Sequence, residues 1–279
     1  MLSAAPVSAQ HAAHYYSADN YCSAEAEQYS KWQGQAATHL ELSGPVDADT
    51  FAKLLQGHTL EGQALQQRTS INHVAGIDLT FSAPKSISLA ALWGGESALL
   101  AIHQRAVQIA LEAVEAYSGT RLWQGNESYR HRFLSTGNIA ISQFDHTTSR
   151  AQDPQLHTHN IVLNTTYTGQ DWRALDTRRL FKYRKLWQTI YHQELRLGCQ
   201  HLGYSLTMQS GHLELAGYAP EHLAYWSKRR QQILQTVGAG ASASQKQIAC
   251  LRTRPRKRAE SALSALQQRW EKESQLLGI

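Results

Sequence analysis

Apolar residues recur with helical spacing along the chain. From Glu96 to Tyr117 they lie three or four positions apart, which predicts a long amphipathic helix. A second long helix is predicted over Tyr183–Gly203, with the glycine as its end. Shorter helices are predicted at three further places: residues 8–16, Asp47–Leu55 and Glu260–Leu277.

Strand patterns occupy the stretches between these helices. Apolar and polar residues alternate over Gly76–Ser82, and Pro84 is expected to stop that strand. Arg132–Phe144 and Gln155–Asn164 are predicted to be two strands of one hairpin, and Tyr204–Leu215 a smaller hairpin. The mixture of long helices and hairpins predicts an α+β fold.

Length and composition fit one extended domain. The chain has 279 residues and 42% hydrophobic residues, enough for a sizeable core. We therefore expect a single domain over 1–279, with 240–279 as a basic and helical C-terminal extension. No phosphate-binding G-x-x-x-x-G-K-[ST] motif occurs in the sequence, which argues against a nucleotide-driven motor of that type.

Charge and cysteine content narrow the class of protein. The formal net charge of +5 favours a polyanionic partner. Cys22, Cys199 and Cys250 are too few and too scattered for a disulfide framework, which suits a reducing compartment. Neither a signal peptide nor a membrane-spanning stretch is expected, so the protein is predicted to be intracellular.

Three histidines form the sharpest chemical pattern. His157 and His159 lie two apart in a predicted strand, so both side chains face the same way. His146 ends the preceding strand of the hairpin and can supply a third imidazole. Three imidazoles leave coordination positions open, as in catalytic metal sites. A pair of exposed histidines on a sheet face is the simpler alternative.

Other histidine enzymes match the sequence less well. A cupin would need a glutamate three or four residues after the H-x-H pair, where Val162 and Leu163 stand. A carbonic-anhydrase-like site would place its third histidine downstream of the pair, whereas His146 lies upstream.

Tyrosines cluster near the N-terminus, at positions 15, 16, 21 and 29. A tyrosine hydroxyl attacks poorly unless a metal ion or a base activates it, because its reference pKa is about 10. A nearby cation would favour the phenolate and polarise a scissile phosphate. Packing with the hydroxyls in water is the alternative for these side chains.

Three sequence strings then point to a known family. They are YYSADNY at 15–21, GIDLTFSAPKSISL at 76–89 and HTTSRAQDPQLHTHNIVLN at 146–164. In this order and spacing they resemble the TraI/TrwC-type relaxase domains of the MobF class, within the HUH endonuclease superfamily. The likeness extends to about Tyr204 and more loosely to the C-terminus.

The resemblance implies a central antiparallel β-sheet flanked by helices. It also implies that His146, His157 and His159 bind a divalent cation, Mg²⁺ or Mn²⁺ with Zn²⁺ as a further option. Asp78 would orient one of these imidazoles, a familiar role for a carboxylate beside a metal site.

The same resemblance assigns the tyrosines. Tyr15 corresponds to the nicking nucleophile, and Tyr16 or Tyr21 would perform a second transfer. Cys22 stands where the family's second pair has its second tyrosine. Any scheme that requires a complete second pair is therefore in doubt.

Basic residues supply candidate DNA contacts. Lys85 and Arg150 lie inside two of the family strings. Arg178 and Arg179 belong to a basic cluster at a predicted helix start, which suits phosphate binding but also a solvated helix face. The basic run Arg252–Arg258 either grips DNA or lies in a solvated tail.

The predicted function is strand-specific nicking and strand transfer at a plasmid origin of transfer, through a 5′-phosphotyrosyl intermediate. Expected partners are single-stranded origin DNA with its hairpin, an accessory DNA-bending protein and the coupling protein of a type IV secretion system. The protein is expected in the bacterial cytoplasm, without membrane insertion, and in the recipient cell while linked to DNA. The alternatives are a non-catalytic single-stranded DNA-binding module, which would need neither histidines nor Tyr15, and a small-molecule metal hydrolase.

Overall fold

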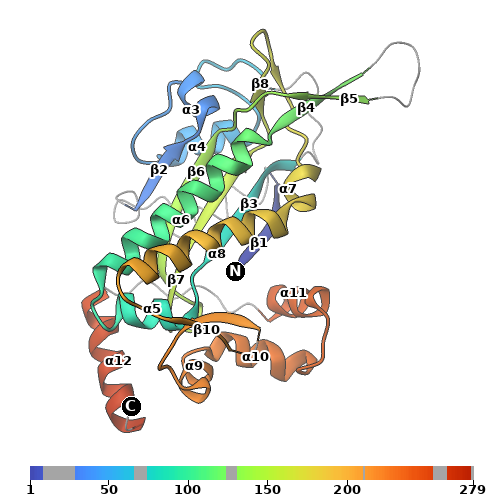
Figure 1. The fold of residues 1–279 in the computed structure, drawn as a ribbon. Helices are drawn as coiled ribbons and strands as arrows, with labels where there is room; N and C mark the ends of the chain where they lie inside the picture. The colour runs from blue at the N-terminus through green and yellow to red at the C-terminus, as the bar shows by residue number, and fades with distance from the viewer. Residues whose placement is uncertain (9–28, 66–73, 124–130, 210, 254–262, 278–279) are drawn as a thin grey trace. The chain divides into compact units, whose positions relative to one another are not determined.

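The computed structural model describes residues 1–8, 29–65, 74–123, 131–209, 211–253 and 263–277. The chain divides into two compact units, each assembled from three separate segments. Unit 1 comprises Met1–Phe81, Arg105–His146 and Thr158–Glu194, and unit 2 comprises Ser82–Gln104, Thr147–His157 and Leu195–Ile279. Figure 1 labels the elements of both units.

A five-stranded antiparallel sheet forms the centre of unit 1, with the order β1-β3-β7-β6-β2. Its strands are Leu2–Ser8 (β1), Val74–Ser82 (β3), Pro154–Leu163 (β7), Ile141–Thr148 (β6) and Ser30–Gln33 (β2). The ends of β6 and β7 continue into unit 2, where a short turn joins them. This sheet confirms the predicted α+β class and the predicted hairpin of the histidine strands.

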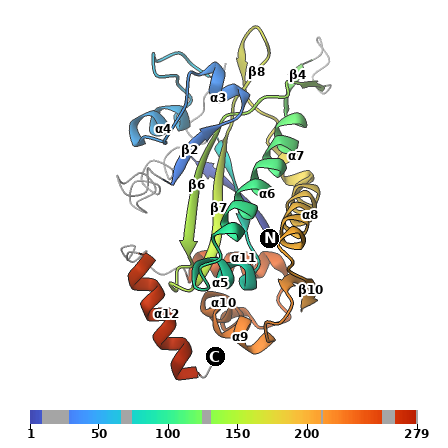
Figure 2. The ribbon, with the colours of Figure 1, turned by 60° about the vertical axis from the view of Figure 1, so that its left-hand side comes forward.

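Helices cover both faces of this sheet, as Figure 2 shows for α4 on one side and α6 and α8 on the other. Two long helices, Ser97–Ala116 (α6) and Arg184–His201 (α8), confirm the two long helices expected from the sequence. The ring centroids of Phe81 on β3 and Tyr191 on α8 lie 5.1 Å apart. The opposite face is covered by Ala48–Leu55 (α4), whose N-cap Asp47 accepts a hydrogen bond from the backbone N–H of Thr50 at 2.8 Å.

The remaining elements of unit 1 are short. They are Gln35–His39 (α3), Gly119–Trp123 (β4), His131–Ser135 (β5), Thr166–Tyr167 (β8), Trp172–Arg173 (β9) and Arg178–Lys182 (α7). Unit 2 contains Lys85–Leu92 (α5), Leu206–Gln209 (β10), His212–Leu215 (β11), Pro220–Tyr225 (α9), Lys228–Val237 (α10), Ala243–Arg252 (α11) and Leu263–Leu277 (α12). The hairpin of β10 and β11 and the terminal helix α12 confirm two further predictions. Within the described ranges, no helix combines the length and the apolar character that crossing a membrane requires.

The region between β5 and β6 differs from the sequence prediction. The single strand predicted over Arg132–Phe144 is wrong, because the chain breaks between β5 and β6. Gly137 adopts a φ of +62° there, which interrupts the extended backbone. The Asn138 side chain forms hydrogen bonds with backbone groups of Thr136 and Tyr167. Strands β1 and β2 and helix α5 were not anticipated. The helix expected at residues 8–16 lies outside the described residues apart from Ser8, which ends β1.

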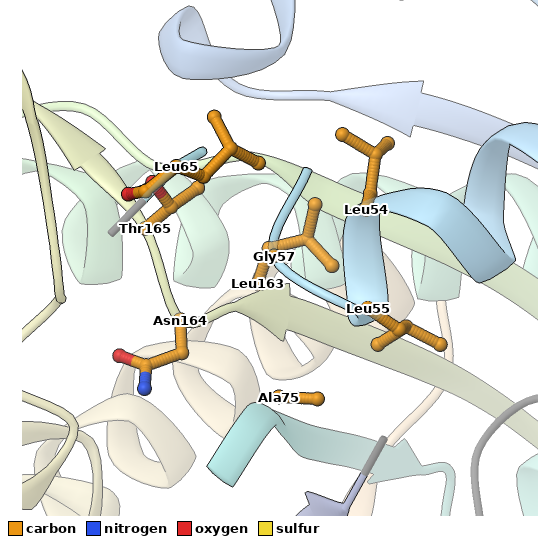
Figure 3. Close-up of a pocket in the computed structure, with 8 residues that line it drawn as sticks. All are labelled: Leu54, Leu55, Gly57, Leu65, Ala75, Leu163, Asn164 and Thr165. Carbon is orange, nitrogen blue, oxygen red and sulfur yellow. The ribbon is translucent and has the colours of Figure 1, made fainter. Parts of the chain in front are cut away.

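Aromatic packing under α4 forms the core on that face of the central sheet. The Phe51 ring lies 6.2 Å from Trp32 and 5.7 Å from Phe144, measured between centroids. Figure 3 shows a cavity at the edge of the core, between the end of α4 and the ends of β3 and β7. Its volume of about 10 Å³ suits no more than one water molecule. This cavity is therefore too small to hold a larger ligand.

We expect Phe51→Ala to lower the free energy of unfolding by about 3–5 kcal/mol, because the buried ring leaves a cavity between two other rings. Urea unfolding followed by fluorescence measures the loss. Phe51→Leu is the control and should cost much less, since it keeps most of the volume. A loss below about 1 kcal/mol for Phe51→Ala would contradict this view of the core.

Candidate metal centre

The histidine face of the sheet begins where the apolar core ends. Residues two apart in a strand share a face. His146 therefore lies on the same face of β6 as Phe144, and His159 lies on the same face of β7 as Ile161. Phe144 and Ile161 belong to the core under α4. The His146 and His159 ring centroids lie 5.5 Å apart, with the rings nearly perpendicular. His157 lies two residues before His159 on the same strand.

Asp78 on β3 contacts one of these histidines directly. Its Oδ2 lies 2.7 Å from Nδ1 of His159, and both side chains are about 15% exposed, at 14% and 15%. Strands β3 and β7 are neighbours in the sheet, which brings together two residues that are 81 positions apart in the sequence. The structure therefore places Asp78 where the resemblance implied, beside a candidate metal ligand.

These contacts determine which imidazole nitrogen is available to a metal. A carboxylate only accepts hydrogen bonds, so Nδ1 of His159 donates to Asp78 and its Nε2 is directed away. Nδ1 of His157 lies 2.9 Å from the carbonyl oxygen of Gln155 and likewise donates. Such outer partners are typical of metal-binding histidines, because they select the tautomer and fix the ring.

Thr80 is a member of this group that the sequence analysis missed. Its hydroxyl donates to Oδ1 of Asp78 at 3.0 Å and lies 3.1 Å from Nδ1 of His159. A threonine two residues after a strand aspartate shares its face, and this spacing could have indicated the contact. Thr80 helps to hold the carboxylate in the orientation that faces the imidazole.

The three histidines suit a divalent ion in donor chemistry. Among the described residues, no three His, Cys, Asp or Glu side chains are already gathered closely enough to hold an ion. In two of the three imidazoles Nδ1 donates a hydrogen bond, so Nε2 is the ring nitrogen that carries the lone pair. Binding by His146, His157 and His159 together stays a prediction.

Replacing Asp78 with asparagine should weaken metal binding by roughly 10-fold, within the range usual for an outer carboxylate partner. The amide keeps the shape but loses the negative charge that favours Nδ1–H on His159. Isothermal titration with Mn²⁺ measures the change. Asp171→Asn, which alters an aspartate paired with Arg173 on β9, serves as the control. Equal affinities in the wild type and Asp78→Asn would show that Asp78 does not act through the metal.

The predicted tyrosines Tyr15, Tyr16 and Tyr21, together with Cys22, lie outside the described residues. Their roles therefore stay predictions. Tyr29, the fourth tyrosine of the cluster, is described and has 60% of its surface exposed. Its backbone carbonyl accepts a hydrogen bond from the N–H of Asp145 at 3.0 Å, next to His146.

Lys85 occupies a buried position in unit 2, at the start of α5. Its Nζ donates to the carbonyl oxygen of Pro154 at 2.6 Å. Burial lowers the pKa of Lys85 to about 8, although the negative charges of Asp153 and Glu214 oppose this shift. Burial and the bond to a carbonyl favour a structural role over the predicted contact with DNA phosphate. Arg150 lies half-buried in the turn between β6 and β7.

The predicted DNA contacts on α7 differ in accessibility. The Arg178 side chain is 69% exposed, and its Nε lies 3.1 Å from Oδ1 of Asp176. The Arg179 guanidinium lies 4.0 Å from the centre of the Phe133 ring, and its Nε donates to the carbonyl of Tyr117 at 3.2 Å. A cation held over an aromatic ring is stabilised by the ring's negative face. Arg178 is thus the freer of the two to reach a phosphate.

Solved structures with this fold define its class. A structure of the conjugative relaxase TrwC in complex with oriT DNA and copper is 36% identical, with a TM-score of 0.86, and the match covers 100% of this chain and 99% of that chain. A second TrwC structure, complexed with a 27-mer DNA comprising the recognition hairpin and the cleavage site, is 35% identical with a TM-score of 0.85 and the same coverage. The fold is that of the conjugative relaxases.

The family follows from the sequence match. The model of the TrwC relaxase family matches residues 8–277, so this chain belongs to the TrwC relaxase family. The multifunctional conjugation protein TraI of Escherichia coli is 38% identical over 240 residues, which are 81% of this chain. This chain spans about 13% of the length of that relative. The predicted MobF-class relationship is confirmed.

Proposed function

We propose that this protein nicks one DNA strand at a plasmid origin of transfer and keeps the 5′ end as a tyrosyl ester. The observation that carries the proposal is the hydrogen bond between Asp78 and His159 in a chain of the TrwC relaxase family. A module that only bound DNA would not need an imidazole oriented by a carboxylate. The oriT DNA in the TrwC complexes supports the choice of substrate.

The bond changes in this reaction balance without a co-substrate. The Tyr15 hydroxyl loses its proton as its oxygen attacks the scissile phosphorus, the bond from phosphorus to O3′ breaks, and O3′ takes up a proton and leaves as the 3′ hydroxyl. The phosphotyrosyl ester preserves the energy of the broken phosphodiester, so the strand can be rejoined without ATP. Tyr16 or Tyr21 would accept the strand in a second transfer, since Cys22 cannot form the same ester.

His146, His157 and His159 would hold a divalent ion, which we propose to be Mg²⁺ or Mn²⁺, with Zn²⁺ as the alternative. Such an ion supplies charge that polarises the phosphate oxygens and lowers the pKa of a nearby phenol. The metal-bound TrwC structures support a metal at this class of site. Asp78 holds the tautomer of His159 in which Nε2 carries the lone pair.

The remaining proposals concern the setting of this reaction. We propose that residues 1–279 act as one relaxase domain with 240–279 as its extension, because both compact units are built from interleaved segments. Arg150, Arg178 and Arg179 would contact the bound strand. The expected partners are a DNA-bending accessory protein and a coupling protein of a type IV secretion system, with action in the bacterial cytoplasm and passage to the recipient on DNA.

A covalent adduct tests the proposal. Purified protein is incubated with supercoiled plasmid carrying its origin of transfer, with and without Mg²⁺ or Mn²⁺, and then digested for mass spectrometry. We expect nucleotide mass on the peptide that contains Tyr15, only with the origin and a metal. If neither metal yields an adduct on any peptide, the proposed function is wrong.

A further inference from the structure

The turn between the two histidine strands is tied to the C-terminal helices within unit 2. This turn, Ser149–Asp153, begins three residues after His146 and ends four residues before His157. The backbone N–H of Ser149 donates to the carbonyl of Asp153 at 3.0 Å, and the Ser149 hydroxyl accepts from the N–H of Asp153 at 3.2 Å. Its conformation therefore bears on both strands that carry the candidate ligands.

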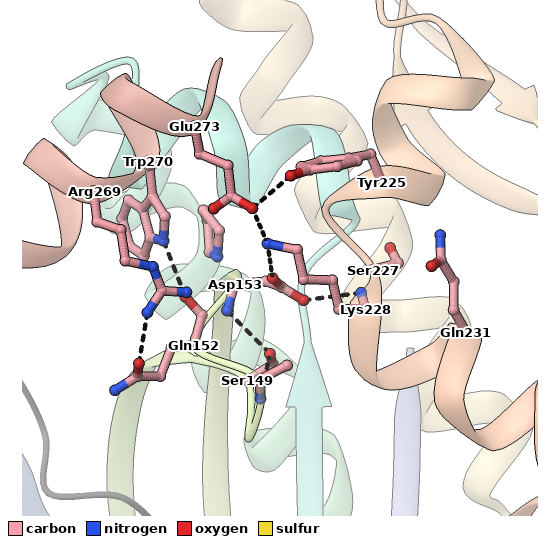
Figure 4. A network of polar contacts seen from close by, with 12 residues as sticks. Ser149, Gln152, Asp153, Tyr225, Ser227, Lys228, Gln231, Arg269, Trp270 and Glu273 are labelled. Carbon is pink, nitrogen blue, oxygen red and sulfur yellow. Dashed lines mark hydrogen bonds and ion pairs between the residues drawn. The ribbon is translucent and has the colours of Figure 1, made fainter. Parts of the chain in front are cut away.

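Gln152 gives this turn an unfavourable backbone. Its φ of +61° lies in the left-handed region, which a residue with a side chain adopts only with support. Two residues of α12 provide that support, as Figure 4 shows. The indole N–H of Trp270 donates to the carbonyl of Gln152 at 2.9 Å, and Arg269 donates to its side-chain oxygen at 2.6 Å. Trp270 is completely buried.

Asp153 is held from a second helix. It is 1% exposed, and a buried carboxylate needs polar partners. The backbone N–H of Lys228, at the start of α10, donates to its Oδ2 at 2.9 Å, and the Lys228 ammonium lies 3.5 Å from its Oδ1. That ammonium also binds Glu273 of α12, which accepts a further hydrogen bond from the Tyr225 hydroxyl at 2.5 Å. The carboxylate and both helices thus form one connected network (Figure 4).

We propose that Lys228, Arg269, Trp270 and Glu273 form a C-terminal clamp that positions the Ser149–Asp153 turn and, through it, the metal-binding histidines. They act as positioning residues, because Lys228, Arg269 and Trp270 contact the turn and Glu273 binds Lys228. The inference rests on the proposed function. Metal ligands must be held within a few tenths of an ångström, so a turn free to leave its strained conformation would cost metal affinity.

The clamp residues support an unfavourable backbone conformation at Gln152 and a buried negative charge at Asp153. Without the Trp270 and Arg269 contacts, Gln152 would relax toward an ordinary φ and shift the ends of β6 and β7. The Lys228 ammonium and Lys85 both compensate the buried charge of Asp153, so loss of Lys228 would remove one of these two cations together with its ion pair. Relaxation of Gln152 and loss of the Lys228 ion pair would each change the turn directly and the histidines only through the turn.

The test compares Trp270→Phe with Trp93→Phe. The first removes the indole donor to the turn and keeps most of the buried ring. The second removes an indole that also bonds α12, through Glu271 at 3.0 Å, but does not contact the turn. A second matched pair is Lys228→Met against Lys272→Met, an exposed lysine on α12. Co²⁺ alone is titrated into each metal-free protein and followed by its visible absorption, and thermal melting monitors folding.

We expect Trp270→Phe and Lys228→Met to weaken Co²⁺ binding about fivefold, below the roughly 10-fold loss expected for a direct outer partner such as Asp78. The Mn²⁺ concentration for half-maximal nicking should rise by the same factor, with full activity regained at high Mn²⁺. The two controls should match the wild type, and hairpin DNA affinity should not change in any variant.

Two outcomes would overturn the clamp. One is Co²⁺ affinity in Trp270→Phe equal to the wild type. The other is an equal loss in Trp270→Phe and Trp93→Phe, which would mean that α12 contributes only general stability. A wild-type protein that forms no tyrosyl adduct would instead refute the proposed function, so the two failures are distinguishable.

Discussion

Tyr15→Phe is expected to abolish cleavage of an oligonucleotide that carries the nick site, with a loss of about 10³-fold or more, as is typical when a nucleophile is removed. Phenylalanine keeps the ring but has no oxygen to form the ester bond. A labelled strand on a denaturing gel measures both the cut product and the protein-linked product. Binding to the uncut oligonucleotide should be unchanged, because the hydroxyl serves the chemical step.

Tyr29→Phe is the matched control. Tyr29 is exposed, and its contact next to His146 is made by the backbone carbonyl, which the substitution leaves intact. This variant should cleave at the wild-type rate. If Tyr15→Phe still cuts at the same phosphodiester, the nucleophile lies elsewhere, and Tyr16→Phe and Tyr21→Phe become the variants to examine.

His159→Ala should cost about 10²- to 10³-fold in the nicking rate and most of the metal affinity. A bound cation contributes several kcal/mol to charge stabilisation in the transition state, and about 1.4 kcal/mol corresponds to each factor of ten in rate. The substitution removes one imidazole and leaves Asp78 with only the Thr80 hydroxyl among the residues of this group. Metal titration and single-turnover nicking are measured on the same preparation.

His201→Ala provides the control, because His201 is exposed on α8 and has no assigned role. It should retain both metal affinity and rate. Thermal melting of both variants separates a loss of metal from a loss of folding. A His159→Ala protein that binds one Mn²⁺ with wild-type affinity would remove this histidine from the proposed ligand set.

Local patterns were sufficient for the elements that repeat a simple spacing. The amphipathic helices α6 and α8 follow from apolar residues three or four apart, since that spacing lines one side of a helix. The common direction of His157 and His159 follows from strand alternation alone. The α4 cap at Asp47 is equally local, because a side chain binds a backbone N–H three residues away.

Short or atypical segments escaped this reasoning. β1 contains a proline and β2 has only four residues, so neither provides enough alternation to be recognised. Both strands owe their conformation to pairing, β1 with β3 and β2 with β6. The predicted strand over Arg132–Phe144 failed for a related reason, because its two halves pair with different partners.

The sequence by itself determined the repeating elements, the H-x-H pair and, through three motifs, the family. Only the tertiary structure decided which residues meet across the chain. Asp78 reaches His159 because β3 pairs with β7, and the buried Lys85 donates to the carbonyl of Pro154, 69 positions away. Trp270 reaches the Gln152 carbonyl from 118 positions away. Periodicity reports which side of an element faces the core, whereas contacts between distant segments depend on how whole elements pack, and no local pattern encodes that.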